Sequence, residues 1–196
     1  MKIIGLTGSV GSGKSTVGAL MEKNFSVKMS MTDNIGHLAM EPGQDSYQKI
    51  VEYFGTDILQ EDKSIDRNRL SAIVFSDASK LEVLNGMIHP WVKLYLRRDI
   101  EAQQRMQRFS YYVIESAILF QTQLDSMCEE VWYVDASEEI RRERLKKDRG
   151  YSEEKVEAIM RQQWENEQWK LHCDRVIENN RDETWILAQL ENYLVS

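Results

Sequence analysis

The residues best suited to chemistry form a glycine-rich segment near the start of the chain. Residues 8–15, Gly-Ser-Val-Gly-Ser-Gly-Lys-Ser, fit the pattern G-x-x-x-x-G-K-[ST] in full. Glycines let the backbone curl until successive N–H groups point at one anion, and the dipole of a following helix adds to the attraction. Lys14 would reach the β- and γ-phosphates of a nucleoside triphosphate, and the Ser15 hydroxyl would ligate Mg²⁺. The segment therefore predicts a site for a triphosphate and its metal.

A glycine-rich turn could also serve only for tight packing, or bind a dinucleotide. The Lys-Ser pair argues against both alternatives, because the spacing here is not that of G-x-G-x-x-G. A phosphate loop leaves the reaction open. The chain has no Asn-Lys-x-Asp motif for reading guanine, and a mechanical ATPase is usually larger than 196 residues. A compact kinase of small molecules fits best.

Basic residues are unevenly distributed along an acidic chain. The 32 acids outnumber the 25 bases, which argues against a protein that coats nucleic acid or an anionic membrane. Residues 1–30 nevertheless hold four bases and one acid, and residues 141–149 hold six bases and two acids. We therefore expect these two segments to face one small, enclosed polyanion.

The elements that must position the phosphate loop follow from apolar patterns. Residues 2–7 are predicted as a buried strand, and a helix is expected from Ser15 onward. Residues 26–30 predict a second strand, and Asp33 is a candidate N-cap for a helix that ends before Pro42. The phosphate loop thus stands between a strand and a helix, as its motif requires.

The rest of the chain predicts more strands and helices in alternation. Strands are expected at 111–115, 130–135 and 175–178, and helices at 137–147, at 152 to about 169, and from the cap Asp182 to Leu194. Residues 44–108 are expected to be helical almost throughout, with a single break at Pro90. The alternation predicts an α/β fold with a mainly parallel sheet, and the helical stretch 44–108 is an insertion on one side of it.

Length and composition limit the class of protein. A chain of 196 residues with 42% hydrophobic and 29% charged residues is typical of one globular domain with embellishments. No apolar run reaches the roughly 18 residues of a membrane span, and the start lacks the layout of a secretion signal. Cys128 and Cys173 lack metal-ligand spacing and are too few for a disulfide scaffold. We expect a soluble, cytoplasmic protein, monomeric or weakly oligomeric, with no nucleic-acid or membrane partner.

From Gly5 to about Asn180, the sequence resembles the dephospho-coenzyme A kinase family. The phosphate loop itself is shared by many families, but the order of the other motifs is specific. The shared motifs are Gly-Leu-Thr-Gly-Ser-Val-Gly-Ser-Gly-Lys-Ser-Thr at 5–16, Glu-Pro-Gly at 41–43, Phe-Gly at 54–55, Ile-Asp-Arg-x-x-Leu at 65–70, Val-Phe at 74–75, Leu-Asn at 84–85, Ile-His-Pro at 88–90, Leu-Phe at 119–120, Gln163, and Cys-Asp-Arg-Val-Ile-Glu-Asn-Asn at 173–180.

The resemblance implies a fold and an activity. The fold would be a P-loop NTPase-type, doubly wound, parallel five-stranded sheet flanked by helices, with a helical substrate-side insertion and a lid. The single kinase domain would have its core at 1–43 and 109–196, the acceptor-side insertion at about 44–108 and the lid at about 137–165. The enzyme would be a phosphotransferase that uses ATP and Mg²⁺ to phosphorylate the 3′-hydroxyl of dephospho-CoA, the last step of coenzyme A biosynthesis.

The resemblance also implies roles for particular residues. Asp33 matches the second aspartate of the family's Asp-Ala-Asp signature and would take the proton of the attacking hydroxyl, alongside or instead of capping a helix. Arg144 would stabilise charge on the moving phosphoryl group together with Lys14. The other residues expected at the site are Gly8, Gly11, Ser12, Gly13, Ser15, Thr16 and Asn179 for the nucleotide, and His37, Asp66, Arg67 and His89 for the acceptor.

Each of the weaker assignments has a structural alternative. His89 could be a hydrogen-bonded core residue, Asp66 and Arg67 could pair with each other, and Asn179 could be a turn former instead of a contact for adenine. Glu115, at the end of a predicted strand, could hold the water shell of Mg²⁺ or be an ordinary strand-end acid.

Some positions depart from the family pattern. Met31 replaces the first aspartate of the signature, and His37 stands where an arginine is usual. Residues 117–121 lack the family's proline and final glutamate, and the family's Arg-Asp pair is reversed as Asp148-Arg149. Two alternatives therefore remain at this stage: a P-loop kinase of another small hydroxyl acceptor, such as a nucleoside or nucleotide, or a catalytically weakened nucleotide-binding regulator.

Overall fold

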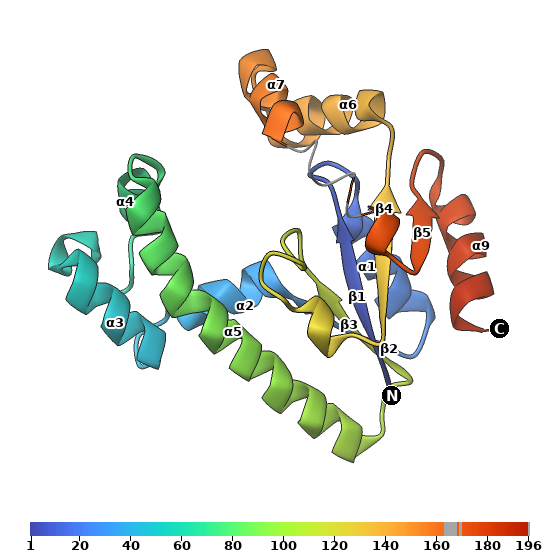
Figure 1. The fold of residues 1–196 in the computed structure, drawn as a ribbon, viewed down its shortest axis with the longest axis horizontal. Coiled ribbons are helices and arrows are strands. Elements are labelled where there is room, and N and C mark those ends of the chain that lie inside the picture. Colours follow the sequence, from blue (N-terminus) through green and yellow to red (C-terminus); the bar gives the residue numbers. More distant parts are fainter. Residues whose placement is uncertain (163–167, 169, 196) are drawn as a thin grey trace. The chain divides into compact units, whose positions relative to one another are not determined.

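Five strands of the chain form one sheet, in the order β2-β3-β1-β4-β5. The computed structural model describes residues 1–162, 168 and 170–195. Each strand begins and ends within one residue of its predicted range. The strands are β1 (Lys2–Gly8), β2 (Val27–Met31), β3 (Tyr111–Glu115), β4 (Glu130–Asp135) and β5 (Arg175–Glu178) (Figure 1).

The strands run parallel, and their carboxyl ends meet at one edge of the sheet. In the register of the sheet, Leu6 of β1 lies opposite Glu115 of β3, and Gly8 lies opposite Val134 of β4. Asp135 of β4 lies opposite Glu178 of β5. The predicted doubly wound α/β fold is thereby confirmed, and this edge is the place where such sheets bind ligands.

The sheet is held by a continuous apolar core. Its strands are rich in β-branched and aromatic residues, and helices α1 (Lys14–Asn24) and α9 (Glu183–Leu194) pack against it. Asp182 caps α9 as predicted, because its side chain accepts a hydrogen bond from the backbone N–H of Trp185. The buried residues of this core are Ile4, Leu6, Val17, Leu20, Met21, Val27, Val113, Trp132, Val134, Ile177, Ile186, Leu190 and Leu194.

The chain divides into two compact units. The first comprises Met1–Ser30 and Gln103–Ser196 and contains the sheet, and the second comprises Met31–Ala102. The division into a core, an acceptor-side insertion and a lid stays a prediction.

The second unit is built from helices around its own core. They are α2 (Thr32–Ala39), α3 (Asp45–Phe54), the 3-10 turn η1 (Thr56–Ile58), α4 (Arg67–Phe75) and α5 (Ala78–Met106), whose last residues extend into the first unit's range. The side chains buried together in this unit are Ile50, Ile58, Ile65, Leu70, Val74 and Leu84. The predicted helical character of residues 44–108 is correct in outline.

The predicted break at Pro90 is wrong. Helix α5 runs without interruption from Ala78 to Met106 with Pro90 inside it (Figure 1). Proline removes one backbone hydrogen bond and costs about 3 kcal/mol in a helix interior. Leu84 before the proline and Val92, Leu96 and Ile100 after it are all buried, at intervals of a multiple of four residues. Packing of one continuous apolar face therefore outweighs the local cost, and the real interruptions lie at 55–66 and 76–77.

The prediction of Asp33 as an N-cap is also wrong. Helix α2 begins at Thr32, directly after β2, with Met31 in the capping position and no side-chain hydrogen bond to the helix end in the described structure. Asp33 is therefore in the first helical turn. A carboxylate there is favoured by the helix dipole, and its oxygens are not used to cap the helix.

Two further helices follow β4 in the first unit. Helix α6 (Glu138–Arg149) is capped by Ser137, and α7 (Glu153–Gln162) follows it. Arg142 pairs with Glu138 and Glu157, so this base belongs to an ion-pair network between the two helices. Residues 163–165 of the predicted lid, including the motif residue Gln163, lie outside the described residues. In the described part of the chain, no helix is long and apolar enough to cross a membrane.

Candidate active site

The phosphate loop joins β1 to α1 and has the backbone geometry that its glycines predict. Gly11 and Gly13 have φ values of 82° and 86°, in the left-handed region that glycine tolerates best. A Cβ on Gly13 would also collide with Nδ2 of Asn179, so a larger residue is disfavoured by contact as well as by conformation. The loop closes on itself through a hydrogen bond of 3.1 Å from Ser12 N to Ser9 O.

The N-terminus of α1 is open to an anion. Gly13 occupies its capping position without a side-chain cap, and the first turn holds no acidic residue among the described positions. The first N–H groups of a helix have no partner within the helix, and the helix dipole makes that end attractive to phosphate. This geometry supports the predicted triphosphate site.

Lys14 lies folded over the loop that it belongs to. Its Nζ donates hydrogen bonds to the carbonyl oxygens of Gly8 at 2.8 Å and Ser9 at 3.3 Å. The ammonium group is thereby held above the loop, half-buried, where a bound phosphate would meet it.

Ser15 and Glu115 meet at the loop, although 100 residues separate them in sequence. Ser15 Oγ donates to Glu115 Oε1 at 3.2 Å, and Glu115 is buried at the carboxyl end of β3. Thr16 is exposed beside them. A hydroxyl and a carboxylate are hard oxygen donors of the kind that Mg²⁺ prefers. The pair therefore fits one metal ion that is shared with substrate phosphates.

The described residues offer no self-sufficient metal cage. No group of three or more His, Cys, Asp or Glu side chains within them could hold an ion. A magnesium ion that arrives with a nucleotide needs no such cage, because it keeps several waters and takes one or two protein ligands.

Arg144 of α6 is also brought to the loop. Its Nη1 donates to the carbonyl oxygens of Gly11 at 3.4 Å and Ser12 at 3.2 Å. Its Nη2 donates to the backbone oxygen of Asn179 at 3.1 Å and to Oδ1 of the same residue at 3.3 Å. The arginine that sequence reasoning assigned to the moving phosphoryl group is thus anchored on the loop backbone itself.

One residue of the loop's support was missed by sequence reasoning. Tyr133 of β4 shares a buried hydrogen bond of 2.8 Å with Ser9 Oγ. Its position in an apolar strand gave no signal of a role at the loop, because only the pairing of β4 with β1 brings it there.

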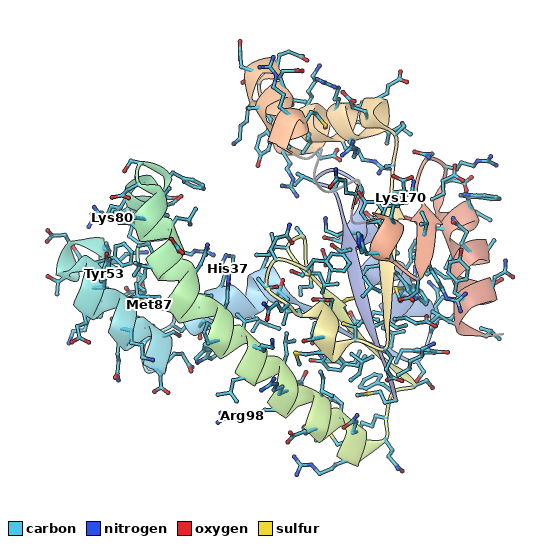
Figure 2. The ribbon with its side chains drawn as sticks, in the orientation of Figure 1. His37, Tyr53, Lys80, Met87, Arg98 and Lys170 are labelled. Carbon is cyan, nitrogen blue, oxygen red and sulfur yellow. The ribbon has the colours of Figure 1, made fainter. Side chains whose placement is uncertain are left out.

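The predicted acceptor residues lie in the second unit. Asp33 and His37 are both exposed on α2, and the His37 side chain projects from this helix (Figure 2). Among the described residues, the structure assigns neither side chain a structural hydrogen bond or ion pair. Both are therefore open to a ligand.

Asp66, Arg67 and His89 have different surroundings. Asp66 accepts hydrogen bonds from the N–H groups of Asn68 and Arg69 at the start of α4, and it pairs with the Arg69 side chain at 3.2 Å. The suggested pairing of Asp66 with Arg67 is therefore wrong, because the helical spacing favours the partner three residues on. Arg67 is exposed. Burial lowers the pKa of His89, because it disfavours the charged imidazolium.

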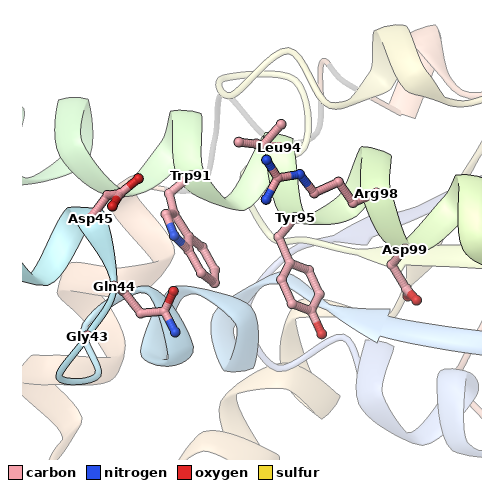
Figure 3. Close-up of a pocket in the computed structure, with 8 residues that line it drawn as sticks. All are labelled: Gly43, Gln44, Asp45, Trp91, Leu94, Tyr95, Arg98 and Asp99. Atoms are coloured by element: carbon pink, nitrogen blue, oxygen red, sulfur yellow. The ribbon is translucent and has the colours of Figure 1, made fainter.

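A cavity of about 420 Å³ lies between the start of α3 and one face of α5. The rings of Trp91 and Tyr95 stack in it with centroids 5.5 Å apart, and Arg98 lies one turn further on (Figure 3). Its lining residues are Gly43, Gln44, Asp45, Trp91, Leu94, Tyr95, Arg98 and Asp99. Sequence reasoning missed this cavity, although two aromatic residues four positions apart in a predicted helical stretch, Trp91 and Tyr95, were a usable signal.

The known proteins that this chain resembles are kinases, which agrees with the phosphate-binding geometry of the site. A family model described as Dephospho-CoA kinase matches residues 2–184. A dephospho-CoA kinase of Lactobacillus johnsonii is 37% identical over 81% of this chain and 78% of its own length. A dephospho-CoA kinase of Carboxydothermus hydrogenoformans is 35% identical over 92% of this chain and 86% of its own.

A solved structure shares the fold over nearly the whole chain. The crystal structure of TT1252 from Thermus thermophilus superposes with a TM-score of 0.82 and 27% identity, covering 99% of this chain and 96% of that one.

Proposed function

This chain belongs to the dephospho-CoA kinase family and is an ATP-using kinase of dephospho-CoA, and from that premise we propose which of its residues carry the reaction. The observation that supports the proposal most is the complete phosphate loop at the carboxyl edge of a parallel sheet, with Lys14, Ser15 and Arg144 gathered on it. The alternative of another small hydroxyl acceptor has no support from these comparisons.

The nucleotide phosphates bind at the N-terminus of α1 in this proposal. Backbone N–H groups of the loop donate to them, and Lys14 exchanges its bonds with Gly8 and Ser9 for bonds to the phosphates. Arg144 adds positive charge beside the loop. Together these groups stabilise the negative charge that redistributes over the γ-phosphoryl group during transfer.

Mg²⁺ is the metal that fits the donors present. Ser15 and Glu115 would hold it, Ser15 directly and Glu115 through its water shell. When bound, the ion neutralises phosphate charge and orients the triphosphate.

Asp33 is the proposed general base. The 3′-hydroxyl oxygen of dephospho-CoA forms a bond to the γ-phosphorus while the bond from that phosphorus to the β,γ-bridging oxygen breaks, which releases ADP. The hydroxyl proton passes to the Asp33 carboxylate, which is exposed and available because it caps no helix.

We assign the cavity beside Trp91 and Tyr95 to the part of the acceptor that does not react. Its volume of about 420 Å³ lies within the range of small-molecule sites, and its lining combines aromatic rings with an amide, carboxylates and a guanidinium. The pantetheine arm of dephospho-CoA is a flexible chain in which methyl and methylene groups alternate with a hydroxyl and two amides, and this mixture of apolar and polar groups suits such a lining. Binding energy from a remote group of this kind helps to hold the reacting hydroxyl in place.

Truncated acceptors test this assignment. With Trp91→Ala, we expect KM for dephospho-CoA to rise about tenfold or more, because one aromatic contact is lost. AMP, which lacks the arm, should react slowly and equally with both proteins. If Trp91→Ala impaired the reaction of AMP as much as that of dephospho-CoA, the cavity would not be the binding site of the arm.

The proposed function as a whole is tested by ADP release in the presence of Mg²⁺. Release that depends on dephospho-CoA, with the new phosphate located on the 3′-oxygen by NMR, is the expected result. Tight ATP binding without transfer to any acceptor would instead indicate the weakened regulator that Met31 and His37 suggest. A cytoplasmic location and a monomeric or weakly oligomeric state remain predictions.

A further inference from the structure

The carbonyl groups on the outer face of the phosphate loop need hydrogen-bond donors, which the glycines of the loop do not provide. When successive N–H groups of a loop turn inward toward an anion, the carbonyl groups turn outward and need donors of their own. Two of these carbonyls belong to Gly11 and Ser12, and both accept hydrogen bonds from side chains remote in sequence.

Asn179 is the residue that joins these bonds. Its Nδ2 donates to Ser12 O at 2.7 Å, and its Oδ1 accepts from Arg144 Nη2 at 3.3 Å. Its backbone N–H donates to Asp135 O at 2.7 Å, at the end of β4. The side chain is only 2% exposed. Both ends of one buried amide are therefore used, one toward the loop and one toward the arginine.

The arrangement is specific to an amide. A carboxylate in the place of Asn179 could still accept from Arg144 but would set an oxygen against the Ser12 carbonyl oxygen, and a leucine could make neither bond. The contact is also tight, since Nδ2 occupies the space that a Cβ on Gly13 would need. Asn179 thus lies directly against Gly13, the residue in the capping position of α1.

We propose that Asn179 is a positioning residue: it holds the Ser12 carbonyl outward directly, and the Gly11 carbonyl through the Arg144 guanidinium that it orients, and so presets the loop N–H groups for phosphate. Arg144 of α6 supports the same two carbonyls with its own hydrogen bonds. This inference rests on the proposed function only in taking the loop as the ATP site. It differs from the expectation that Asn179 contacts adenine, because the groups its amide binds are the loop and Arg144.

The test compares Asn179→Asp and Asn179→Leu with the matched control Asn180→Asp. Asn180 lies one residue on, where its Oδ1 accepts from Ser137 N at 2.7 Å and its Nδ2 donates to Glu178 Oε1 at 3.2 Å. Aspartate keeps the acceptor and, as at position 179, loses the amide donor, but here that donor is not bonded to the loop. The control therefore adds the same negative charge without touching the loop. Binding of ATP, of inorganic tripolyphosphate and of adenosine is measured by calorimetry on the full chain.

For both Asn179 variants, we expect the dissociation constants of ATP and of tripolyphosphate to rise by a similar factor, about ten- to hundredfold, and that of adenosine to stay constant. Asn180→Asp should bind all three ligands like the wild type. KM for dephospho-CoA should change little, whereas KM for ATP should follow the dissociation constant.

Three outcomes would overturn the inference. If ATP binding weakens and tripolyphosphate binding does not, Asn179 contacts adenine. If the melting temperature falls while the folded protein keeps its affinity for both phosphates, the residue serves stability alone. If the Asn180→Asp control loses as much affinity as Asn179→Asp, the effect is one of added charge. Failure of the wild-type chain to bind ATP would instead count against the proposed function.

Discussion

At the scale of single residues, the positively and negatively charged side chains have different proposed roles: the cations stabilise the phosphates, and a carboxylate accepts the proton. Lys14 of the phosphate loop and Arg144 of α6 both donate hydrogen bonds to loop carbonyls, and both supply positive charge there. Asp33 supplies a carboxylate in the first turn of α2, with no capping role to occupy it. The separation of roles means that removing the base and removing a cation should have different kinetic signatures.

Asp33→Asn is expected to lower kcat by a factor of about 10² to 10⁴, the usual contribution of a positioned acid or base. KM for ATP should change less than threefold, since the proposed role of the carboxylate is to take the acceptor's proton and not to bind the nucleotide. Steady-state kinetics with both substrates varied make the comparison. Unchanged kcat in the variant would exclude Asp33 as the base.

At the scale of elements, ion pairs and caps hold together the strands that carry the site. Glu130 of β4 accepts from Lys2 of β1 at 2.6 Å, from the Trp132 indole at 2.8 Å and from Arg175 of β5 at 3.2 Å. Three neighbouring strands are thus tied together at their starting ends. The opposite ends of the same strands carry the phosphate loop, Asp135 and Asn179.

The Glu130 network predicts a loss of stability in acid. Burial alone raises the pKa of Glu130, but the hydrogen bonds from Lys2, Trp132 and Arg175 outweigh it and lower the pKa to about 2. The folded pKa is below the unfolded one, so the contribution is complete above about pH 4.5 and is lost as pH falls toward 2. We expect a contribution on the order of 2 kcal/mol.

Urea unfolding of the wild type and of Glu130→Gln checks this prediction. The difference in free energy of unfolding should be largest at pH 7 and should shrink between pH 4.5 and pH 3. A difference that stays constant over this range would show that the carboxylate charge is not what stabilises the strands.

Asp182→Ala is expected to destabilise α9 by about 1 kcal/mol, the usual cost of losing a helix cap. The side chain accepts from Trp185 N at 3.0 Å, and the helix packs Ile186, Leu190 and Leu194 into the sheet core. In a chain of this size, that corresponds to a fall of about 2–4 °C in melting temperature. Asp182→Asn, which keeps an acceptor, should melt near the wild type, and equal melting of the alanine variant would contradict the prediction.

At the scale of the whole molecule, the net charge of -7 hides two basic segments. The phosphate loop and Arg144 of the second basic segment lie together in the folded first unit. A net negative charge and two bases gathered at one loop, Lys14 and Arg144, therefore occur in one protein, which suits the binding of one small polyanion.

ATP is expected to stabilise the folded chain by mass action. At a concentration of about one hundred times Kd, the gain is about 2.7 kcal/mol, which raises the melting temperature by several degrees. Lys14→Ala should show little of this shift at the same ATP concentration, because its ammonium group is lost from the loop. Thermal melting with and without ATP measures both, and an undiminished shift in Lys14→Ala would count against its contact with the phosphates.

Much of the fold and the nucleotide site could be predicted from the sequence, because those features depend on neighbours along the chain. The pattern of residues 8–15 sets the loop by itself, since glycine spacing and a following helix are local properties. Short apolar runs, two of them rich in β-branched and aromatic residues, placed all five strands within one residue of their observed ends.

Only the tertiary structure decided how distant residues combine. Ser15 meets Glu115, and Ser12 meets Arg144 and Asn179, because the strand order brings the ends of β1, β3, β4 and β5 to one edge. Pro90 could not be placed correctly from local propensity, because the buried face of α5 outweighs the cost of a proline. Sequence neighbours determine the loop and the strands, whereas contacts across a hundred residues or more depend on sheet order and packing, which no local pattern encodes.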